Sequence, residues 1–421
     1  MKRFALILLI FLLSLAVVPG TGTAQEAISA SYDTNIEFPT TLTFSLDAKS
    51  SADITQIILS YKIDMITTVT VITDIEPQFN SAPAVKTSWE WDMSTVSLPP
   101  GAEIQYSWRI EDTAGHELET PWKTAQFNDN RYSWKSLTVG KITLFWYEGE
   151  QSFAQELMDS ANSALAKLAQ DTGAHLVQAV DIYIYASSQD LLGALISPQE
   201  WTGGVAFPEY GIIIIGIAPD NLAWGKGAMT HELAHLVTYQ MTSNPYSDIP
   251  TWLNEGLSMY AEGPLDPTFA SLLVKTISED RLFSVQTLSS NFPANPGEAT
   301  LSYAESYSLI QFLIQHYGQE KMLNLLSTFK QGSTYDDALE KVYGFNTTGL
   351  DNLWRLSLGL EPRQATPTPQ ATPTPKTGFL GCREASAKTA HNGVAWLGVL
   401  GILVLPVLGE AIRLKARRGK R

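Results

Sequence analysis

The stretch HELAH at residues 231–235 contains residue types that bind a transition metal and move a proton. Residues four apart in an α-helix lie on the same face, so His231 and His235 would present their imidazoles one turn apart. Two such nitrogens can share one zinc ion at about 2.0–2.1 Å each. Glu232, beside the first histidine, is positioned to accept a proton from a water molecule on that ion. The stretch therefore predicts half of a zinc site.

A second stretch, HELET at residues 116–120, starts in the same way but ends in threonine. It lies among strand-like segments, and residues four apart in a strand are distant from one another. We interpret HELET as a surface hairpin, so a His-Glu pair alone does not indicate a metal site.

A third ligand is available on a second predicted helix. The segment IPTWLNEGLSMYAEGP covers residues 249–264, with Pro250 and Thr251 suited to a helix start and Gly263 to its end. Glu255 lies in its first turns, twenty positions after His235. Hydrolytic zinc sites use three protein ligands and a water molecule. The alternative reading is two helix-face histidines without a metal and an acid near a helix start.

HELAH followed by a glutamate twenty residues later resembles the gluzincin metallopeptidases. The segment WLNEGLSMYAE is similar to the corresponding helix of the aminopeptidase-N branch, and YAESYSLIQFLIQHYG (303–318) resembles the helix of that branch that carries a tyrosine and a glycine at this spacing. The resemblance covers roughly residues 200–320 and implies a thermolysin-like, peptidase-MA-like zinc metallopeptidase domain.

This resemblance implies a role for each matching residue. His231, His235 and Glu255 would bind one zinc ion per chain, and Glu232 would be the general base. Tyr303 would donate a hydrogen bond to the developing oxyanion, with Tyr307 and Tyr260 as alternatives. The other histidines outside such a cluster, His175 and His316, are expected to be structural.

The sequence departs from the aminopeptidase pattern at the strand before the HELAH helix. That branch has Gly-x-Met-Glu-Asn there, whose glutamate holds the substrate's free amine, whereas this chain has GVAFP at residues 204–208. Glu209 and Glu262 are possible substitutes. Cleavage at the amino terminus and cleavage at internal bonds therefore both stay open. Asn254 is expected to orient either a ligand or this strand.

The rest of the chain predicts a multidomain protein. Residues 27–130 read as short strands with turns, which indicates an all-β sandwich of immunoglobulin or fibronectin type. Residues 135–360 begin with strands and end in helices, which is typical of an α+β domain. Residues 364–378 are a Pro/Thr-rich linker. Cys382 is the single cysteine, so no internal disulfide can form.

Both ends of the chain predict a membrane-related location. Residues 1–24 have a basic start, an apolar run and small residues, as in a secretory signal peptide. Residues 393–412 are apolar enough for a transmembrane helix, and the basic tail 413–421 would stay in the cytoplasm. We therefore expect a single-pass cell-membrane protein with its catalytic part outside the cytoplasm.

The sequence favours a membrane-anchored zinc peptidase acting on peptides or proteins. The net charge of −15 argues against nucleic acid as a partner. The alternative is a non-catalytic surface binding or adhesion protein built on a metallopeptidase-like scaffold. The presence of Glu232 favours the enzyme, because a scaffold needs at most the ligands. The partner of the sandwich and the substrate stay open.

Overall fold

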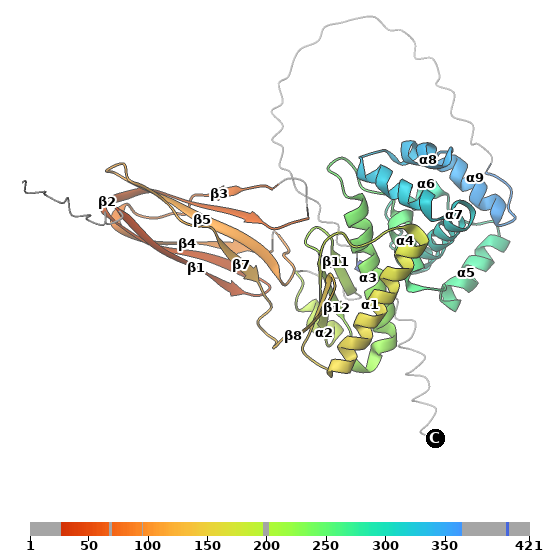
Figure 1. Cartoon of the computed structure of the whole chain (residues 1–421), viewed down its shortest axis with the longest axis horizontal. Helices are drawn as coiled ribbons and strands as arrows, with labels where there is room; N and C mark the ends of the chain where they lie inside the picture. Colours follow the sequence, from red (N-terminus) through yellow and green to blue (C-terminus); the bar gives the residue numbers. More distant parts are fainter. Residues whose placement is uncertain (1–26, 67–69, 95, 197–201, 364–400, 404–421) are drawn as a thin grey trace, which may run out of the picture.

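The computed structural model describes residues 27–66, 70–94, 96–196, 202–363 and 401–403. A β-rich amino-terminal part lies beside a second part in which helices cover a sheet (Figure 1). The signal-like segment and the Pro/Thr-rich linker lie outside the described residues.

The amino-terminal part is organised by one long strand, β2 (Thr41–Ile63). Its first half pairs with β1 (Ile28–Glu37) and β4 (Ala82–Asp92), and its second half pairs with β5 (Ala102–Asp112) and β3 (Thr73–Ile75). Two further strands, β6 (Glu117–Glu119) and β7 (Lys123–Phe127), pair with β5. All these strand pairings are antiparallel.

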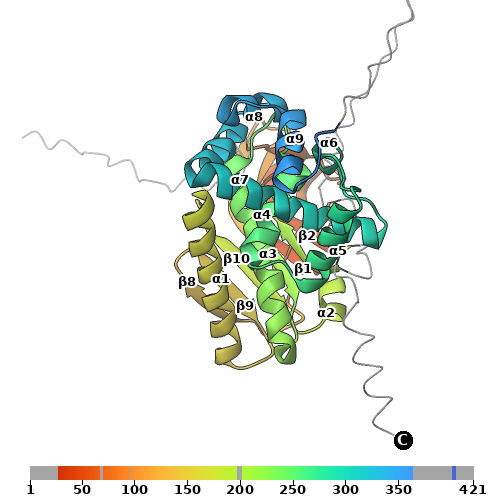
Figure 2. The same ribbon diagram turned by 90° about the vertical axis from the view of Figure 1, so that its right-hand side faces the viewer.

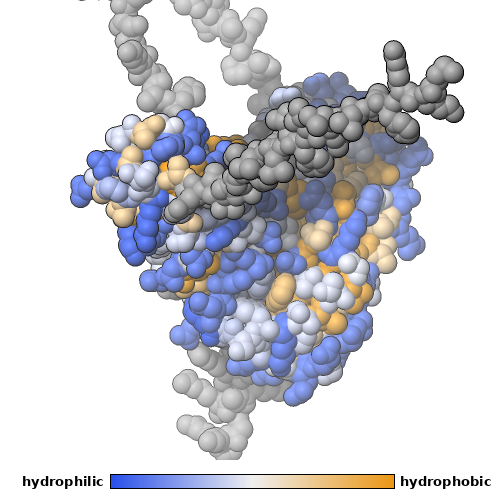
Figure 3. All heavy atoms as spheres, turned by 60° about the vertical axis from the view of Figure 1, so that its left-hand side comes forward, coloured by the Kyte–Doolittle hydropathy of each residue, from blue (hydrophilic) through white to orange (hydrophobic). Residues whose placement is uncertain are grey.

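The two halves of β2 face each other across an aromatic core. The Phe44 ring, from the first half, lies 5.0 Å from the Tyr106 ring of β5 and 6.4 Å from the Tyr61 ring of the second half. Alternate residues of the first half of β2 are buried, as period-2 burial in a one-sided sheet requires. The face of the molecule shown in Figure 3 is mostly hydrophilic, with scattered apolar patches.

The second part contains a six-stranded mixed sheet in the order β13-β11-β12-β10-β9-β8. Its central strands, β9 (Ile142–Trp146), β10 (Val180–Tyr185) and β12 (Ile212–Gly216), are parallel. The run IIII in β12 is buried on both faces, as expected for a parallel strand covered on each side. The flanking strands β8 (Lys135–Val139) and β11 (Thr202–Phe207) run antiparallel to their neighbours.

Helices cover one face of this sheet (Figure 2). The central helix α3 (Leu222–Thr242) follows a 3₁₀ turn and contacts α4 (Thr251–Glu262), β11 and two long helices. The two long helices are α1 (Gln151–Thr172) and α7 (Pro296–Lys330). The smaller helices on this side are α5 (Pro267–Ser278), α6 (Val285–Leu288), α8 (Tyr335–Tyr343) and α9 (Thr347–Ser357). Helix α2 (Ser188–Leu192) instead buries Leu191 in the core shared with the sandwich.

The opposite face of the sheet packs against the amino-terminal part, residues 27–130, which is called the sandwich below because the two halves of β2 face each other there. Strand β11 shows both environments: Val205 and Phe207 belong to the core shared with the sandwich, whereas Ala206 belongs to the core beneath the helices. A side chain on each successive strand residue points to the opposite face. Strand β11 therefore packs against the sandwich on one face and against the helices on the other.

The expected fold class was wrong in its last element, the transmembrane helix at residues 393–412. Among the described residues no helix is both long and apolar enough to cross a membrane. Gly401–Leu403, inside the predicted span, instead form strand β13, which pairs antiparallel with β11. An apolar run is compatible with a buried strand as well as with a helix, so hydropathy alone does not decide between them. The rest of the segment lies outside the described residues.

Candidate metal centre

The HELAH stretch lies in the middle of α3, where its two histidines share one helix face. The side chains of His231 and His235 are 4% and 2% exposed, and their rings lie 4.8 Å apart. Helix α3 is buried on nearly all sides from Met229 to Thr238. Such a helix is fixed by its neighbours, which gives its histidines a defined orientation.

Glu255 reaches the two histidines from α4. Its Oε2 lies 3.4 Å from Nε2 of His231 and 3.5 Å from Nε2 of His235. One ligand atom from each of the three side chains lies within 4.8 Å of the other two. The structure thus brings together the three ligands that the sequence proposed.

These three side chains fit a zinc ion. His231 Nε2 and Glu255 Oε2 are buried and have no hydrogen-bond partner among the described residues. Buried polar atoms are normally paired, so atoms left without a partner point to a ligand. A tetrahedral ion with ligands at about 2.0–2.1 Å needs ligand atoms about 3.3 Å apart, which matches both nitrogen–oxygen distances.

The other nitrogen of each imidazole is held by a polar side chain. His231 Nδ1 lies 2.6 Å from Glu262 Oε1, and His235 Nδ1 lies 3.0 Å from Asn254 Oδ1 and 3.1 Å from Ser258 Oγ. If Nδ1–H of each ring donates to these oxygens, Nε2 of each ring has no proton. Its lone pair is then directed toward Glu255 and is available to a metal ion. Such partners fix the tautomer and the ring orientation of metal-binding histidines. The contact of Asn254 with His235 fits the first of its two expected roles, orienting a ligand.

The charges around His231 favour a cation at this position. Burial lowers the pKa of His231, but the nearby carboxylates of Glu255 and Glu262 outweigh it and raise the pKa to about 10. Burial also lowers the pKa of His235, and there it prevails. Two carboxylates lie beside one buried imidazole, so their negative charge favours a positive charge at this position. A divalent ion would supply that charge.

Glu232 lies beside the three ligands without joining them. Its side chain is fully buried, and neither carboxylate oxygen has a hydrogen-bond partner among the described residues. A Cβ at Gly204 of β11 would lie 3.3 Å from Glu232 Oε1, so the carboxylate abuts the edge strand. Burial raises the pKa of Glu232 to about 8, which suits a group that both accepts and donates a proton near neutral pH.

Tyr303, on α7, is the tyrosine next to the ligands. Its ring lies 6.3 Å from the His231 ring and is packed edge-on against Phe292. Burial, with added effects of Glu255, Glu232 and Glu262, raises the pKa of Tyr303, so the hydroxyl stays protonated and can donate. The alternative Tyr260 donates its hydroxyl to Asp171 on α1, and Tyr307 packs beside Tyr260.

The remaining candidates lie elsewhere or have other partners. Glu209 lies in the β11–β12 hairpin, where its carbonyl accepts from Ile66 of the sandwich. His175 and His316 contact carbonyls of their own segments. Glu262, considered above only as an amine-binding residue, holds His231. Its place seven residues after Glu255, two helical turns on the same face, was the signal for this role.

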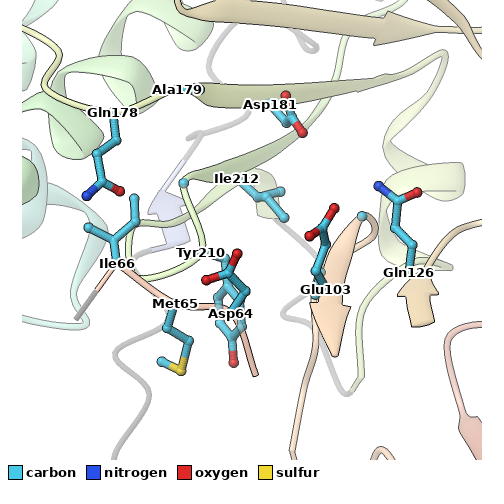
Figure 4. A pocket seen from close by; sticks show the side chains of 13 residues that line it. Asp64, Met65, Ile66, Glu103, Gln126, Gln178, Ala179, Asp181, Tyr210 and Ile212 are labelled. Carbon is cyan, nitrogen blue, oxygen red and sulfur yellow. The ribbon is translucent and has the colours of Figure 1, made fainter. Parts of the chain in front are cut away.

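A separate cavity of about 250 Å³ lies between the sandwich and the sheet (Figure 4). Asp64 and Glu103 line it from the sandwich and Asp181 from β10, and burial raises the pKa of Asp181. None of the proposed metal ligands lines this cavity. It is an interdomain space distinct from the metal centre.

The sequence matches a family model. Residues 160–359 match the Peptidase MA superfamily, and this range includes all three proposed ligands, Glu232 and Tyr303. The chain has no match among curated proteins.

Several solved structures are similar to this chain, at low sequence identity. An M1 zinc metallopeptidase from Deinococcus radiodurans, solved with Tyr-Ser-Ala substrate, is 13% identical over 83% of this chain and 97% of that chain, with a TM-score of 0.35. An aminopeptidase N family protein from Idiomarina loihiensis is 9% identical over 80% and 77%, with a TM-score of 0.37. A β-1,3-glucan-binding domain of carbohydrate-binding module family 56 covers 23% of this chain and 98% of its own, with 17% identity and a TM-score of 0.16.

The assignment rests on the family match and on the convergence of two histidines and a glutamate from α3 and α4. Residues 160–359 are thus similar to the Peptidase MA superfamily, and this match supports a gluzincin-type zinc metallopeptidase domain in this part of the chain.

Proposed function

We propose that this chain binds one zinc ion through His231, His235 and Glu255 and hydrolyses peptide bonds outside the cytoplasm. The observation that carries the proposal is the spacing of 3.4 and 3.5 Å between Glu255 Oε2 and the two imidazole nitrogens. Three protein ligands leave a fourth position for water, as in hydrolytic zinc sites. When bound, the zinc ion would supply Lewis acidity toward water and the substrate carbonyl.

Glu232 is the proposed general base. It would take a proton from the attacking water and deliver it to the leaving amine. Its burial and its pKa of about 8 let it hold the proton between these two events. Since Glu232 is not a ligand, its removal separates proton transfer from metal binding.

Tyr303 is the proposed oxyanion donor. Its protonated hydroxyl would donate a hydrogen bond to the carbonyl oxygen as negative charge develops there. Removing one such donor from an enzyme costs about 10²–10³ in turnover. Its position next to His231 supports this role over Tyr260 and Tyr307, which lie toward α1.

Strand β11 is the proposed support for the substrate backbone. Gly204 places bare main chain next to Glu232, and an extended peptide that took the place of β13 beside this strand could pair with it through main-chain hydrogen bonds. A glycine here keeps the path to Glu232 clear, because a side chain would point at the carboxylate. This arrangement favours peptides as substrates.

The proposed location outside the cytoplasm depends on the signal-like residues 1–24. The membrane anchor expected at residues 393–412 is not part of the proposal, because Gly401–Leu403 form β13.

The test combines zinc content with cleavage of a mixed peptide library. We expect about one zinc per chain, chelator-sensitive cleavage, and loss of cleavage with retained zinc in Glu232→Gln. Zinc without any cleavage, together with a Glu232→Gln protein that behaves like the wild type in every assay, would instead indicate a non-catalytic binding protein. A protein without zinc would contradict the proposal altogether.

A further inference from the structure

The connection between α5 and α6, residues 279–284, contains a strained backbone position. Asp280 has a φ of 52°, in the left-handed region that residues other than glycine rarely adopt. Its Oδ1 accepts from Arg355 Nη2 at 2.7 Å, and the Arg355 side chain is only 4% exposed. Such a conformation persists only where neighbouring groups fix it, and strained positions gather near functional sites. The connection is therefore held in place by the groups around it.

Arg363, the last described residue before the Pro/Thr-rich linker, holds the other end of the connection. Its Nη2 donates to the carbonyls of Leu282 and Phe283, both at 2.7 Å, and its Nε donates to Asp351 Oδ2 at 2.8 Å. The planar fork of a guanidinium suits several such contacts at once. The second oxygen of Asp351 accepts from the Val285 amide at 3.0 Å, so Arg363 and Asp351 together fix the start of α6.

A third side chain of this group comes from α7. Glu305 is fully buried and lies two residues after Tyr303. Its Oε2 accepts from the Phe283 amide at 3.0 Å. Burial raises the pKa of Glu305, and the Phe283 amide and the charge of Arg363 act in the opposite direction. Arg363, Asp351 and Glu305, named the Arg363 cluster below, thus hold one short segment from α7, from α9 and from the residues after α9.

The far end of α6 reaches the helix that carries a proposed zinc ligand. The carbonyl of Ser289, directly after α6, accepts from the Thr251 amide at 3.4 Å, and Thr251 Oγ1 lies 3.5 Å from the same oxygen. Thr251 is the first residue of α4, and Pro250 before it makes no side-chain cap. The first amides of a helix need partners outside it, so this contact stabilises the start of α4. Glu255 lies about one turn further along the same helix.

We propose that Arg363 is a positioning residue for the metal centre, which acts through α6 on the start of α4 and so on Glu255. This inference rests on the proposed peptidase function and adds to it a residue outside the ligand set. Losing the contacts of the Arg363 cluster loosens the first turn of α4, which spreads the positions of the Glu255 carboxylate. Zinc binding responds to such a change, because ligand atoms must lie within narrow distances of one ion.

The test measures zinc affinity and kinetics in the full chain. Arg363→Gln cannot replace a guanidinium that makes three side-chain contacts, so zinc affinity should fall by about tenfold. We expect kcat to fall while KM changes little, because strand β11 lies outside this route. Arg363→Lys keeps the charge but not the fork, so it should recover part of the loss. Competition with a fluorescent chelator gives the affinity, and cleavage of one peptide gives kcat and KM.

Arg281→Gln is the matched control. Arg281 lies in the same connection, but its side chain is 71% exposed and contacts Glu279. Its replacement changes the net charge by the same amount and should leave zinc affinity and kcat unchanged. Equal losses in Arg281→Gln and Arg363→Gln would point to net charge alone and would overturn the inference.

A double-mutant cycle tests the route through α6. Thr251→Pro removes the amide that donates to Ser289, and proline is well tolerated at the first position of a helix. Pro250, with a ψ of 142°, already has the extended conformation that a following proline requires. We expect Thr251→Pro alone to weaken zinc binding and Arg363→Gln to add little in that background. Full additivity of the two losses overturns the inference.

Unfolding measurements separate positioning from folding. If Arg363→Gln lowers the unfolding free energy but keeps wild-type zinc affinity and kcat, Arg363 is only structural and the inference is wrong. If zinc affinity falls as expected but the wild type cleaves no peptide of a mixed library, the proposed peptidase function fails while the role of Arg363 at the metal centre stands. A wild-type chain that binds no zinc contradicts both.

Discussion

The tripeptide His-Glu-Leu occurs twice in this chain, once in the sandwich and once in α3. In the sandwich, His116 is 43% exposed at the side chain, and its Nδ1 lies 2.9 Å from Asp112 Oδ2 in a turn between β5 and β6. In α3, His231 is 4% exposed and lies between Glu255 and Glu262. The same three residues form a turn contact in one place and part of the candidate metal centre in the other.

The difference lies in the backbone and in the neighbouring element. Residues 117–119 are a strand, so Thr120 is carried away from His116, whereas the helix returns His235 to the side of His231. The metal centre also needs α4, which supplies a ligand and the partners of both imidazoles. Short motifs acquire chemistry only when a second element presents complementary groups to them.

The largest expected contrast between the two motifs is in metal binding. His231→Ala removes one of three ligands, so we expect it to abolish stoichiometric zinc binding and peptide cleavage. His116→Ala should leave both unchanged, because no described zinc-site residue contacts it. Zinc analysis of purified protein with a cleavage assay measures the effect. Equal zinc in the two variants would show that α3 is not the metal site.

The second contrast concerns the glutamates of the two motifs. Glu232→Gln should lower kcat by about 10²–10⁴ while zinc content stays the same, because the amide cannot take the water's proton. Glu117→Gln, an exposed residue of β6, should retain wild-type kcat. Steady-state kinetics on one peptide tests both. A drop of similar size in the two variants would remove the case for Glu232 as base.

The third contrast tests the neighbouring element. At Gly256 of α4 a Cβ would lie 2.5 Å from the Ser306 carbonyl oxygen and 2.7 Å from Ile310 Cγ1 of α7. Gly256→Ala should therefore cost about 1–3 kcal/mol of unfolding free energy and weaken zinc binding. Gly227→Ala, where no such clash occurs, should be neutral or stabilising by about 0.5–1 kcal/mol. Denaturant unfolding of both variants measures the difference, and equal stabilities would argue against close α4–α7 packing.

The smallest contrast is in pH dependence. Burial raises the pKa of Glu305 on α7 to about 8, even though its carboxylate accepts from the Phe283 amide. Its folded form binds the proton more tightly than its unfolded form, so the unfolding free energy contributed by Glu305 should fall as pH rises from about 4.5 to 8. Glu305→Gln should flatten that slope.

Asp112, in the sandwich, should behave in the opposite way. A hydrogen bond from Ser50 is the largest effect on it and, with His116, lowers its pKa. Its stabilising contribution is therefore present above its unfolded pKa near 3.8 and is lost as pH falls further. Unfolding curves of Asp112→Asn from pH 3 to 9 should deviate from the wild type mainly above pH 4. The same deviation in both variants would contradict these opposite signs.

Several parts of the structure could be predicted because local rules and packing agree there. Helical spacing placed His231 beside His235, and the helix start at Pro250 and its end at Gly263 bounded the helix that carries Glu255. The alternating strands of the sandwich followed from period-2 patterning. In these segments the residues that set the pattern in the sequence are the same residues that are buried or paired in the structure.

Other parts could not be predicted, since they depend on contacts between distant segments. Ser258 and Asn254 converge on His235 only after α4 packs beside α3. The sequence suggested Glu262 as a residue that binds the substrate amine. Its contact with His231 depends on how α4 is rotated about its axis beside α3. The apolar run that contains Gly401–Leu403 was assigned to a membrane helix, because hydropathy does not show that an edge strand is available for pairing.

Strand β11 connects the two parts of the molecule in a way that limits how they can be separated. The side chains of Val205 and Phe207 lie in the core shared with the sandwich. Gly204, on the same strand, borders Glu232 and has no side chain. Deleting the amino-terminal part would strip the backing from the strand that borders the proton-transfer group. Gene fusions, truncations or domain exchanges that cut between these parts would thus remove the support of the strand that borders Glu232.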